Sequence, residues 1–91
     1  MPAKTSIDKV RARCRRLARA TAQAQVVRAN ALGHYREALA TLPDGPALDR
    51  LVTAYDAADA EARERSRQSL ACLAALADLE RRAQYEEGHG Q

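Results

Sequence analysis

The residues of this 91-residue chain that could do chemistry are few and widely spaced. Cys14 and Cys72 are far apart, and His34 and His89 each lack a cysteine or a second histidine nearby in the sequence. Zinc sites and disulfide frameworks are built from more such residues at short, regular spacings. The sequence therefore predicts no metal site, no cofactor and two buried structural thiols.

A second candidate is the run of acidic residues at positions 56, 59, 61 and 64, which arginines follow at 63, 65 and 67. Acids and arginines four positions apart meet on one face of a helix and form surface ion pairs. Acid–base catalysis by paired carboxylates needs a cleft. The sequence also offers no Gly-rich phosphate loop and no nucleophile with a base beside it. We predict no catalytic residue and a non-enzymatic protein.

The strongest signal is "KVRARCRRLARA", residues 9–20, which holds six basic residues and no acid. On a helical wheel Ile7, Val10, Cys14 and Leu17 share one narrow sector, and the basic residues fill most of the rest. Arginine suits bidentate contacts with phosphate, and such a face could neutralise several phosphates. The candidate surface for a polyanion or an acidic partner comprises Lys9, Arg11, Arg13, Arg15, Arg16 and Arg19.

Three interpretations of this basic face stay open. It is a solvated helix face, a site for nucleic acid or another polyanion, or a site for a membrane surface or a partner's acidic helix. Arg-rich, acid-poor segments are also typical of mitochondrial transit peptides. Asp8 interrupts this one, however, and its apolar pattern continues in phase, so we expect it to belong to the folded domain of a cytoplasmic protein. No apolar run approaches the ~20 residues of a membrane span.

The composition predicts long helices. Hydrophobic residues make up 46% of the chain without any Phe or Trp, and charged residues make up 30%. Ala, Leu, Arg and Glu are strong helix formers. In "LPDGP", residues 42–46, Pro43 ends one helix and Pro46 fits the first turn of the next. We predict a single domain over 1–91. Its first helix covers about 6–42 and is capped by Thr5 or Ser6, and a turn follows at 43–46. Its second helix covers about 47–87 and is stopped by Gly88, and a polar tail follows at 88–91.

Heptad spacing predicts how the two helices pair. The 3-4 alternation of a coiled-coil seam selects Ile7, Val10, Cys14, Leu17, Thr21, Ala24, Arg28, Ala31, Tyr35, Ala38 and Leu42 in the first helix. In the second it selects Leu48, Leu51, Tyr55, Ala58, Ala62, Arg65, Ser69, Cys72, Leu76, Leu79 and Ala83. Folding the chain at Gly45 brings together positions that sum to about 90. The fold class is thus all-α, a long antiparallel helical hairpin that is coiled-coil-like.

Part of the second helix is apolar over too wide an arc. Side chains of "SLACLAALADLE", residues 69–80, cover about half the circumference, more than the ~100° stripe that one partner helix buries. We therefore expect a homo-oligomer, as a four-helix bundle or a higher helical oligomer, with an interface of Leu70, Leu73, Leu76, Ala77 and Leu79. The alternative is a three-helix arrangement with a break near Gly33.

The turn also resembles a known family. "PDGPAL" followed by "LVTAY" resembles the Pro-bounded hairpin turn of type III secretion needle subunits, and a hairpin is similar in shape to their small co-chaperones. The end of the chain, "YEEGHGQ", departs from the apolar last helix of needle subunits. We expect a non-enzymatic helical interaction protein: an adaptor, small chaperone or inhibitor that acts through helix–helix contacts and oligomerisation. The alternatives are binding of nucleic acid or another polyanion through the basic face, and a hairpin of the needle or needle-chaperone kind.

Overall fold

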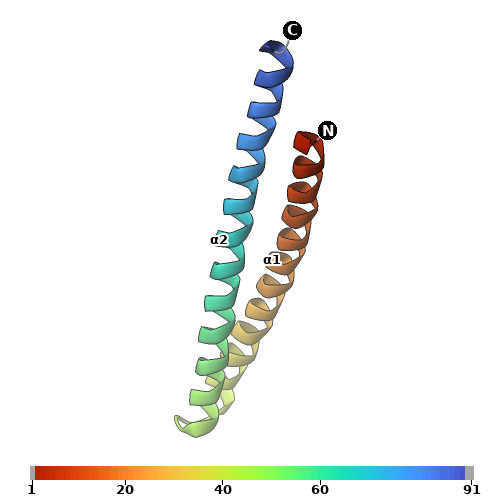
Figure 1. The fold of residues 1–91 in the computed structure, drawn as a ribbon. Coiled ribbons are helices and arrows are strands. Elements are labelled where there is room, and N and C mark those ends of the chain that lie inside the picture. Colours follow the sequence, from red (N-terminus) through yellow and green to blue (C-terminus); the bar gives the residue numbers. More distant parts are fainter. Residues whose placement is uncertain (1, 90–91) are drawn as a thin grey trace.

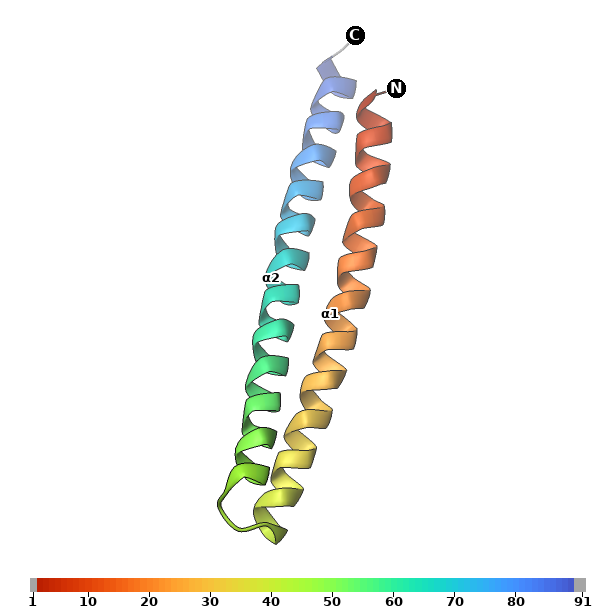
Figure 2. The same cartoon turned by 60° about the horizontal axis from the view of Figure 1, so that its bottom comes forward.

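Two long helices joined by a short turn at residues 42–45 make up the described part of the chain. The computed structural model describes the backbone of residues 2–89 and the side chains of residues 6–88. Helix α1 runs over Pro2–Thr41 and helix α2 over Pro46–His89. Figure 1 and Figure 2 show them side by side and antiparallel, with the turn at one end and both termini at the other. The predicted all-α antiparallel hairpin is confirmed.

The hairpin is a rod. It measures 72 × 15 × 14 Å, and its Cα radius of gyration is 20.4 Å, whereas a compact chain of this length has about 12 Å. Within the described residues, neither helix contains a stretch long and apolar enough to cross a membrane.

The turn follows from its two prolines. The residue before a proline is disfavoured in the α region, so α1 ends at Thr41 and Leu42 lies outside it. The Leu42 amide still donates to the Ala38 carbonyl at 2.7 Å. The Gly45 carbonyl accepts the amide of Asp49 at 3.0 Å, which makes Gly45 the capping residue of α2. Pro46 then occupies the first helical position, where its missing N–H costs nothing.

Both outer ends of the helices extend past their predicted limits. The prediction of Thr5 or Ser6 as the N-cap is wrong, because α1 already begins at Pro2. Proline is well tolerated in a first turn, and the Ala and Lys that follow are strong helix formers. Gly88 does not stop α2, which continues to His89, and no described glycine has positive φ. The predicted polar tail is therefore helical at 88–89, and its last two residues lie outside the described part.

Helix α1 runs without a break through Gly33, so the three-helix alternative is wrong. A glycine inside a helix costs about 1 kcal/mol relative to alanine. Residues 31 and 35 on either side of it pack half-buried in the seam, and this contact with α2 on both sides of the glycine outweighs so small a penalty.

Replacing Gly33 with alanine is expected to stabilise the hairpin by about 0.5–1 kcal/mol. Gly33 has negative φ, and a Cβ added there would meet nothing within 4 Å. The gain comes from the lower entropy of the unfolded chain. Urea denaturation followed by circular dichroism measures the change. A Gly33→Ala chain less stable than the parent would contradict the account of Gly33 as an unstrained helix position.

The seam lies where the heptad spacing predicts it. Seven hydrophobic residues are buried among those described, and all seven are predicted seam positions: Cys14, Ala24, Ala38, Leu48, Ala58, Ala62 and Cys72. The other predicted seam residues are half-buried, except Leu42. Leu42 was expected to face Leu48 but is 41% exposed, because the proline after it ends the helix one residue earlier.

The core is built from small side chains. Four of the seven buried residues are alanines and two are cysteines, so Leu48 is the only large aliphatic side chain buried in the described part. Small side chains let two helices approach closely, but they remove little apolar area from water. Among the described residues, seven large apolar side chains stay exposed and most of the others are only half-buried.

Candidate functional site

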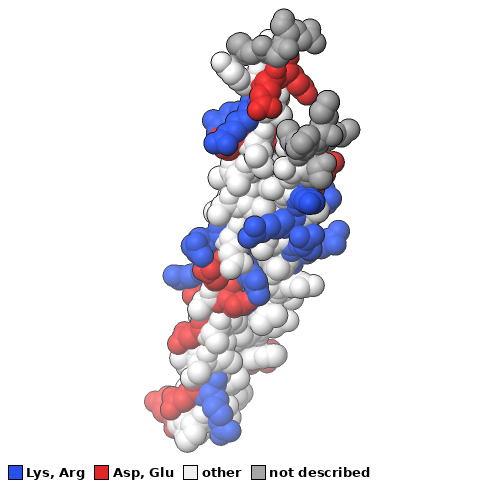
Figure 3. All heavy atoms as spheres, viewed as in Figure 1, with Lys and Arg blue, Asp and Glu red and all other residues white. Residues whose placement is uncertain are grey.

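The basic residues predicted as a binding surface all lie exposed on α1. Arg11 is the one that forms ion pairs: its guanidinium lies 3.8 Å from Asp8 Oδ1 and 3.4 Å from Glu80 Oε1. The other five form no ion pair with any described residue: Lys9, Arg13, Arg15, Arg16 and Arg19. Figure 3 shows Lys and Arg side chains gathered across the upper part of α1 and acidic ones along the lower part of α2.

The seam holds this basic array in place. Val10 and Leu17 are half-buried and Cys14 is buried, so α1 is anchored to α2 throughout the basic segment. The arginines therefore project from a fixed helix. Their Cα positions are set by the hairpin, and only their side chains are left to move.

The structure separates the predicted apolar interface residues into two sets. Leu70 and Leu73 are 68% and 50% exposed, and Ala77 beside them is exposed too. Leu76 and Leu79 are half-buried at seam positions. Leu70, Leu73 and Ala77 thus form an outer surface of α2, which we call the leucine patch. Leu76 and Leu79 mainly contact α1.

Further exposed apolar residues were not singled out from the sequence. Val26 and Val27 on α1 are 59% and 58% exposed, and Leu39 and Tyr85 are exposed as well. The signal was available, because none of the four is a predicted seam position. Counting the large apolar residues that fall outside the seam would have found them.

Two sides of the hairpin can be distinguished by ion pairs between the helices. Arg11 bonds Glu80, and Arg28 Nη1 donates to Asp59 Oδ1 at 3.4 Å. Asp59 also lies 3.0 Å from Arg63 Nε. Residues seven apart share a side of a coiled coil. The ion-pair side therefore carries residues 11, 18, 25, 32 and 39 of α1 and residues 52, 59, 66, 73 and 80 of α2. The leucine patch lies on this side.

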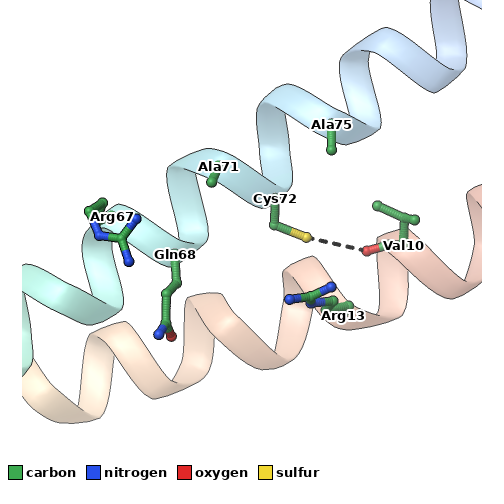
Figure 4. Close-up of a pocket in the computed structure, with 7 residues that line it drawn as sticks. All are labelled: Val10, Arg13, Arg67, Gln68, Ala71, Cys72 and Ala75. Carbon is green, nitrogen blue, oxygen red and sulfur yellow. Dashed lines mark hydrogen bonds between the residues drawn. The ribbon is translucent and has the colours of Figure 1, made fainter.

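The opposite side holds a shallow groove of about 250 Å³. Figure 4 shows its lining, formed by Val10, Arg13, Arg67, Gln68, Ala71, Cys72 and Ala75. Glu64 already engages two of its polar groups: Arg67 Nε donates to Glu64 Oε2 at 2.9 Å, and Gln68 Nε2 donates to Oε1 at 3.1 Å. The hydrogen bond from Arg67 lowers the pKa of Glu64, and the same bond raises the pKa of Arg67. This carboxylate stays ionised and is a poor general acid.

The two cysteines are free and buried, as predicted for structural thiols. Cys72 Sγ donates to the Val10 carbonyl at 3.8 Å across the seam. Burial, followed by a hydrogen bond with the Cys72 thiol, raises the pKa of Cys14 from 9.0 to about 11. The described residues contain no group of three or more His, Cys, Asp or Glu that could hold a metal ion.

We expect Cys14 to be alkylated by iodoacetamide at least 100-fold more slowly in the folded chain than in urea. A pKa raised to about 11 lowers the thiolate fraction about 100-fold at neutral pH. The folded state holds this proton more tightly than the unfolded state. Its contribution to stability is therefore complete below pH 9 and is lost as the pH rises through about 11. Mass spectrometry of timed samples gives both rates, and a difference below tenfold would contradict the burial of Cys14.

The chain matches no protein-family model, no curated protein and no solved structure. The resemblance to type III secretion needle subunits rests on the turn residues alone. The geometry of the two surfaces, the leucine patch and the basic array, is therefore what bears on function.

Proposed function

We propose that this chain is a non-enzymatic helical interaction protein, an adaptor, small chaperone or inhibitor, that acts through helix–helix contacts and self-association. The proposal rests on one observation: more of the large apolar side chains are exposed than are buried. Among the described residues seven large apolar side chains are exposed, Leu70 and Leu73 among them, while only one leucine is buried. Exposed apolar patches on a small protein are typical of interaction sites.

The surface area of the hairpin supports the same proposal. The chain exposes 6965 Å², whereas a compact monomer of 9.9 kDa exposes about 5,200 Å². The surplus of about 1,800 Å² per chain is about twice the roughly 800 Å² that a standard protein–protein interface buries on each partner. One such contact would bring the burial per chain toward that of an ordinary domain.

The ion pairs on α2 support a non-enzymatic role. Asp59 bonds Arg28 and Arg63, Glu61 bonds Arg65, and Glu64 bonds Arg67. Carboxylates engaged in this way serve helix surfaces rather than proton transfer. A cytoplasmic location is part of the proposal, because reducing compartments keep thiols such as Cys14 and Cys72 free.

Sedimentation velocity over a concentration series tests the self-association. We expect a dimer or larger species that dissociates on dilution, with a melting temperature that rises with concentration. A monomer that unfolds cooperatively, with a melting temperature independent of concentration, would overturn the proposal.

A second candidate function is the binding of nucleic acid or another polyanion. Five of the six basic residues over positions 9–19 project to solvent without an ion pair among the described residues, so their charge is free for phosphate. We expect the Arg15→Ala, Arg16→Ala, Arg19→Ala triple variant to elute from heparin at lower salt. The slope of log K against log salt should fall by about 0.9 for each phosphate that the variant no longer neutralises.

The matched control is the triple variant Arg63→Ala, Arg81→Ala, Arg82→Ala, which removes the same charge from arginines that already pair with acids. It should elute close to the parent chain. Equal elution of the two triple variants would show that only net charge matters, and the basic face would then have no role of its own.

A further inference from the structure

The two cysteines meet in the seam between the helices, Cys14 on α1 and Cys72 on α2, and both are buried. Cys72 Sγ donates to the Val10 carbonyl at 3.8 Å, and Figure 4 shows the sulfur pointing across to that turn of α1. The same carbonyl accepts the amide of Cys14 one turn later in the helix. The Cys72 thiol is also a hydrogen-bond partner of the Cys14 thiol. The two sulfur atoms are therefore neighbours across the seam.

The packing of this seam allows a covalent bond at that contact. The buried core consists mainly of alanine and cysteine, and small side chains let helix axes approach to about 8 Å. Cα atoms that face each other at a helix radius of about 2.3 Å then lie about 4–6 Å apart. A disulfide needs a Cα–Cα distance of about 4.4–6.8 Å. The helices therefore need not separate for the two sulfur atoms to be joined.

The groove on this side of the hairpin gives one of the thiols a route to solvent. Cys72 is among the residues that line the groove, and Cys14 is not. Arg13 lines it as well (Figure 4) and forms no ion pair with any described residue. A positive charge beside the thiol attracts an anionic oxidant. We therefore expect Cys72 to react first with an anionic low-molecular-weight disulfide, and Cys14 to react second.

We propose that Cys14 and Cys72 form a reversible disulfide that joins the basic segment of α1, residues 9–19, to α2. The thiolate of Cys72 attacks one sulfur of the small disulfide, whose S–S bond breaks and releases one small thiolate. The thiolate of Cys14 then attacks Cys72 Sγ in the mixed disulfide and releases the second small thiolate. The two released thiolates take up the two protons that the cysteines lose. Two cysteine thiols are thus oxidised, and one small disulfide is reduced to two thiols.

The disulfide would control how far the basic segment can leave α2, because Cys14 lies at the centre of residues 9–19. Ile7, Val10 and Leu17 around it are only half-buried, so the reduced chain holds this end of the hairpin by weak contacts. The bond closes a loop of about 60 residues, and a loop of this size restricts the unfolded chain strongly. The basic array stays fixed on the hairpin under oxidising conditions and is free to open under reducing ones.

Equilibration with glutathione disulfide, an anionic disulfide, tests whether the folded hairpin favours the bond. Acid quenching, alkylation and mass spectrometry give the equilibrium constant for disulfide formation in buffer and in concentrated urea. We expect the constant to be at least about 100-fold larger in buffer, because the folded helices hold the thiols in contact. A constant no larger in buffer than in urea would overturn the proposal, and so would a disulfide that links two chains.

A matched control moves one thiol along the same seam. Ala24 is buried like Cys14 and lies about 15 Å from it along α1. The Cys14→Ala, Ala24→Cys variant therefore keeps two buried thiols but separates them. Its equilibrium constant should be no larger in buffer than in urea. A preference for the folded state as strong as that of the parent chain would show that contact between the thiols is not the cause, and the proposal would be wrong.

Hydrogen exchange tests the consequence for the basic segment. Oxidised and reduced chains are compared at one protein concentration, since association also affects stability. Amides of residues 9–19 should exchange at least tenfold more slowly in the oxidised chain, and its melting temperature should be about 10–20 °C higher. The Cys14→Ala, Cys72→Ala variant should behave identically in both redox buffers. Equal exchange of residues 9–19 in the oxidised and reduced parent chain would overturn the control of this segment by the disulfide.

Discussion

Replacing Leu70 and Leu73 together with glutamate is expected to raise the dissociation constant for self-association more than 100-fold. Both side chains are at least half exposed in the single hairpin, so the change should leave the folding of the monomer intact. Burying one leucine is worth about 1.5–3 kcal/mol, and a twofold interface loses each residue twice. A loss of about 3 kcal/mol already corresponds to more than 100-fold.

Val26 and Val27 supply the matched control for this prediction. They are equally exposed, and Val27 shares the groove side with Arg13, fourteen residues before it. The Val26→Glu, Val27→Glu variant adds the same charge on the other side of the rod. Sedimentation equilibrium on both variants measures the dissociation constants. If the valine variant dissociates and the leucine variant does not, the interface lies on the groove side.

The second large effect is expected inside the seam. Ala62 is 2% exposed, the most buried residue of the described core. A leucine there would force the helices apart, because an overpacked core costs about 1–3 kcal/mol. For a chain of this size that lowers the melting temperature by about 4–8 °C per kcal/mol. Ala62→Leu should thus melt well below the parent chain.

Ala60→Leu is the control, because Ala60 is exposed on the outer surface of the same helix. It adds the same side chain without touching the seam and should change the melting temperature by no more than about 2–3 °C, within the range of surface substitutions. Both variants are compared at one protein concentration, since association also shifts the melting temperature. An Ala62→Leu chain as stable as the parent would mean that the seam is loosely packed at this level.

The heptad pattern was sufficient to predict the fold because it records a geometric requirement. Positions that repeat every 3.5 residues must face the same neighbour, and Cys14, Ala58 and Cys72 are buried for that reason. The turn was equally predictable, since Pro43 and Pro46 act through local backbone restrictions. Pattern and turn together fix the register of the two helices.

The sequence could not show whether contacts between the helices outweigh the weak conformational preferences of single glycines. Gly33 suggested a break, but packing on both sides of it carries the helix through. Gly88 suggested a stop, but α2 continues past it without the positive φ that such a stop would use. These local preferences are worth only about 1 kcal/mol, so small differences in context decide them.

The residues of the candidate surfaces could be predicted from the sequence, but their ion pairs and their burial could not. The sequence identified six basic residues, yet only the structure separates Arg11, which bonds Glu80, from the five that form no ion pair in the described part. The sequence likewise placed five apolar residues on one broad face of the second helix. The structure assigns Leu76 to the seam and Leu70 to the outside. Such divisions depend on how far two helix surfaces wrap around each other, which residue types alone do not specify.

The position of Leu48 has a consequence for how the chain folds. It is the one large aliphatic side chain buried in the described core, and it stands two residues after the start of α2, beside the turn. Closing a loop costs least where the sequence separation is shortest, and contacts near the turn form before distant ones. The contact of Leu48 with α1 therefore closes the shortest loop. We expect the hairpin to nucleate at the turn and to form progressively toward the termini. The basic segment of α1 would then be among the last parts to dock and the first to open.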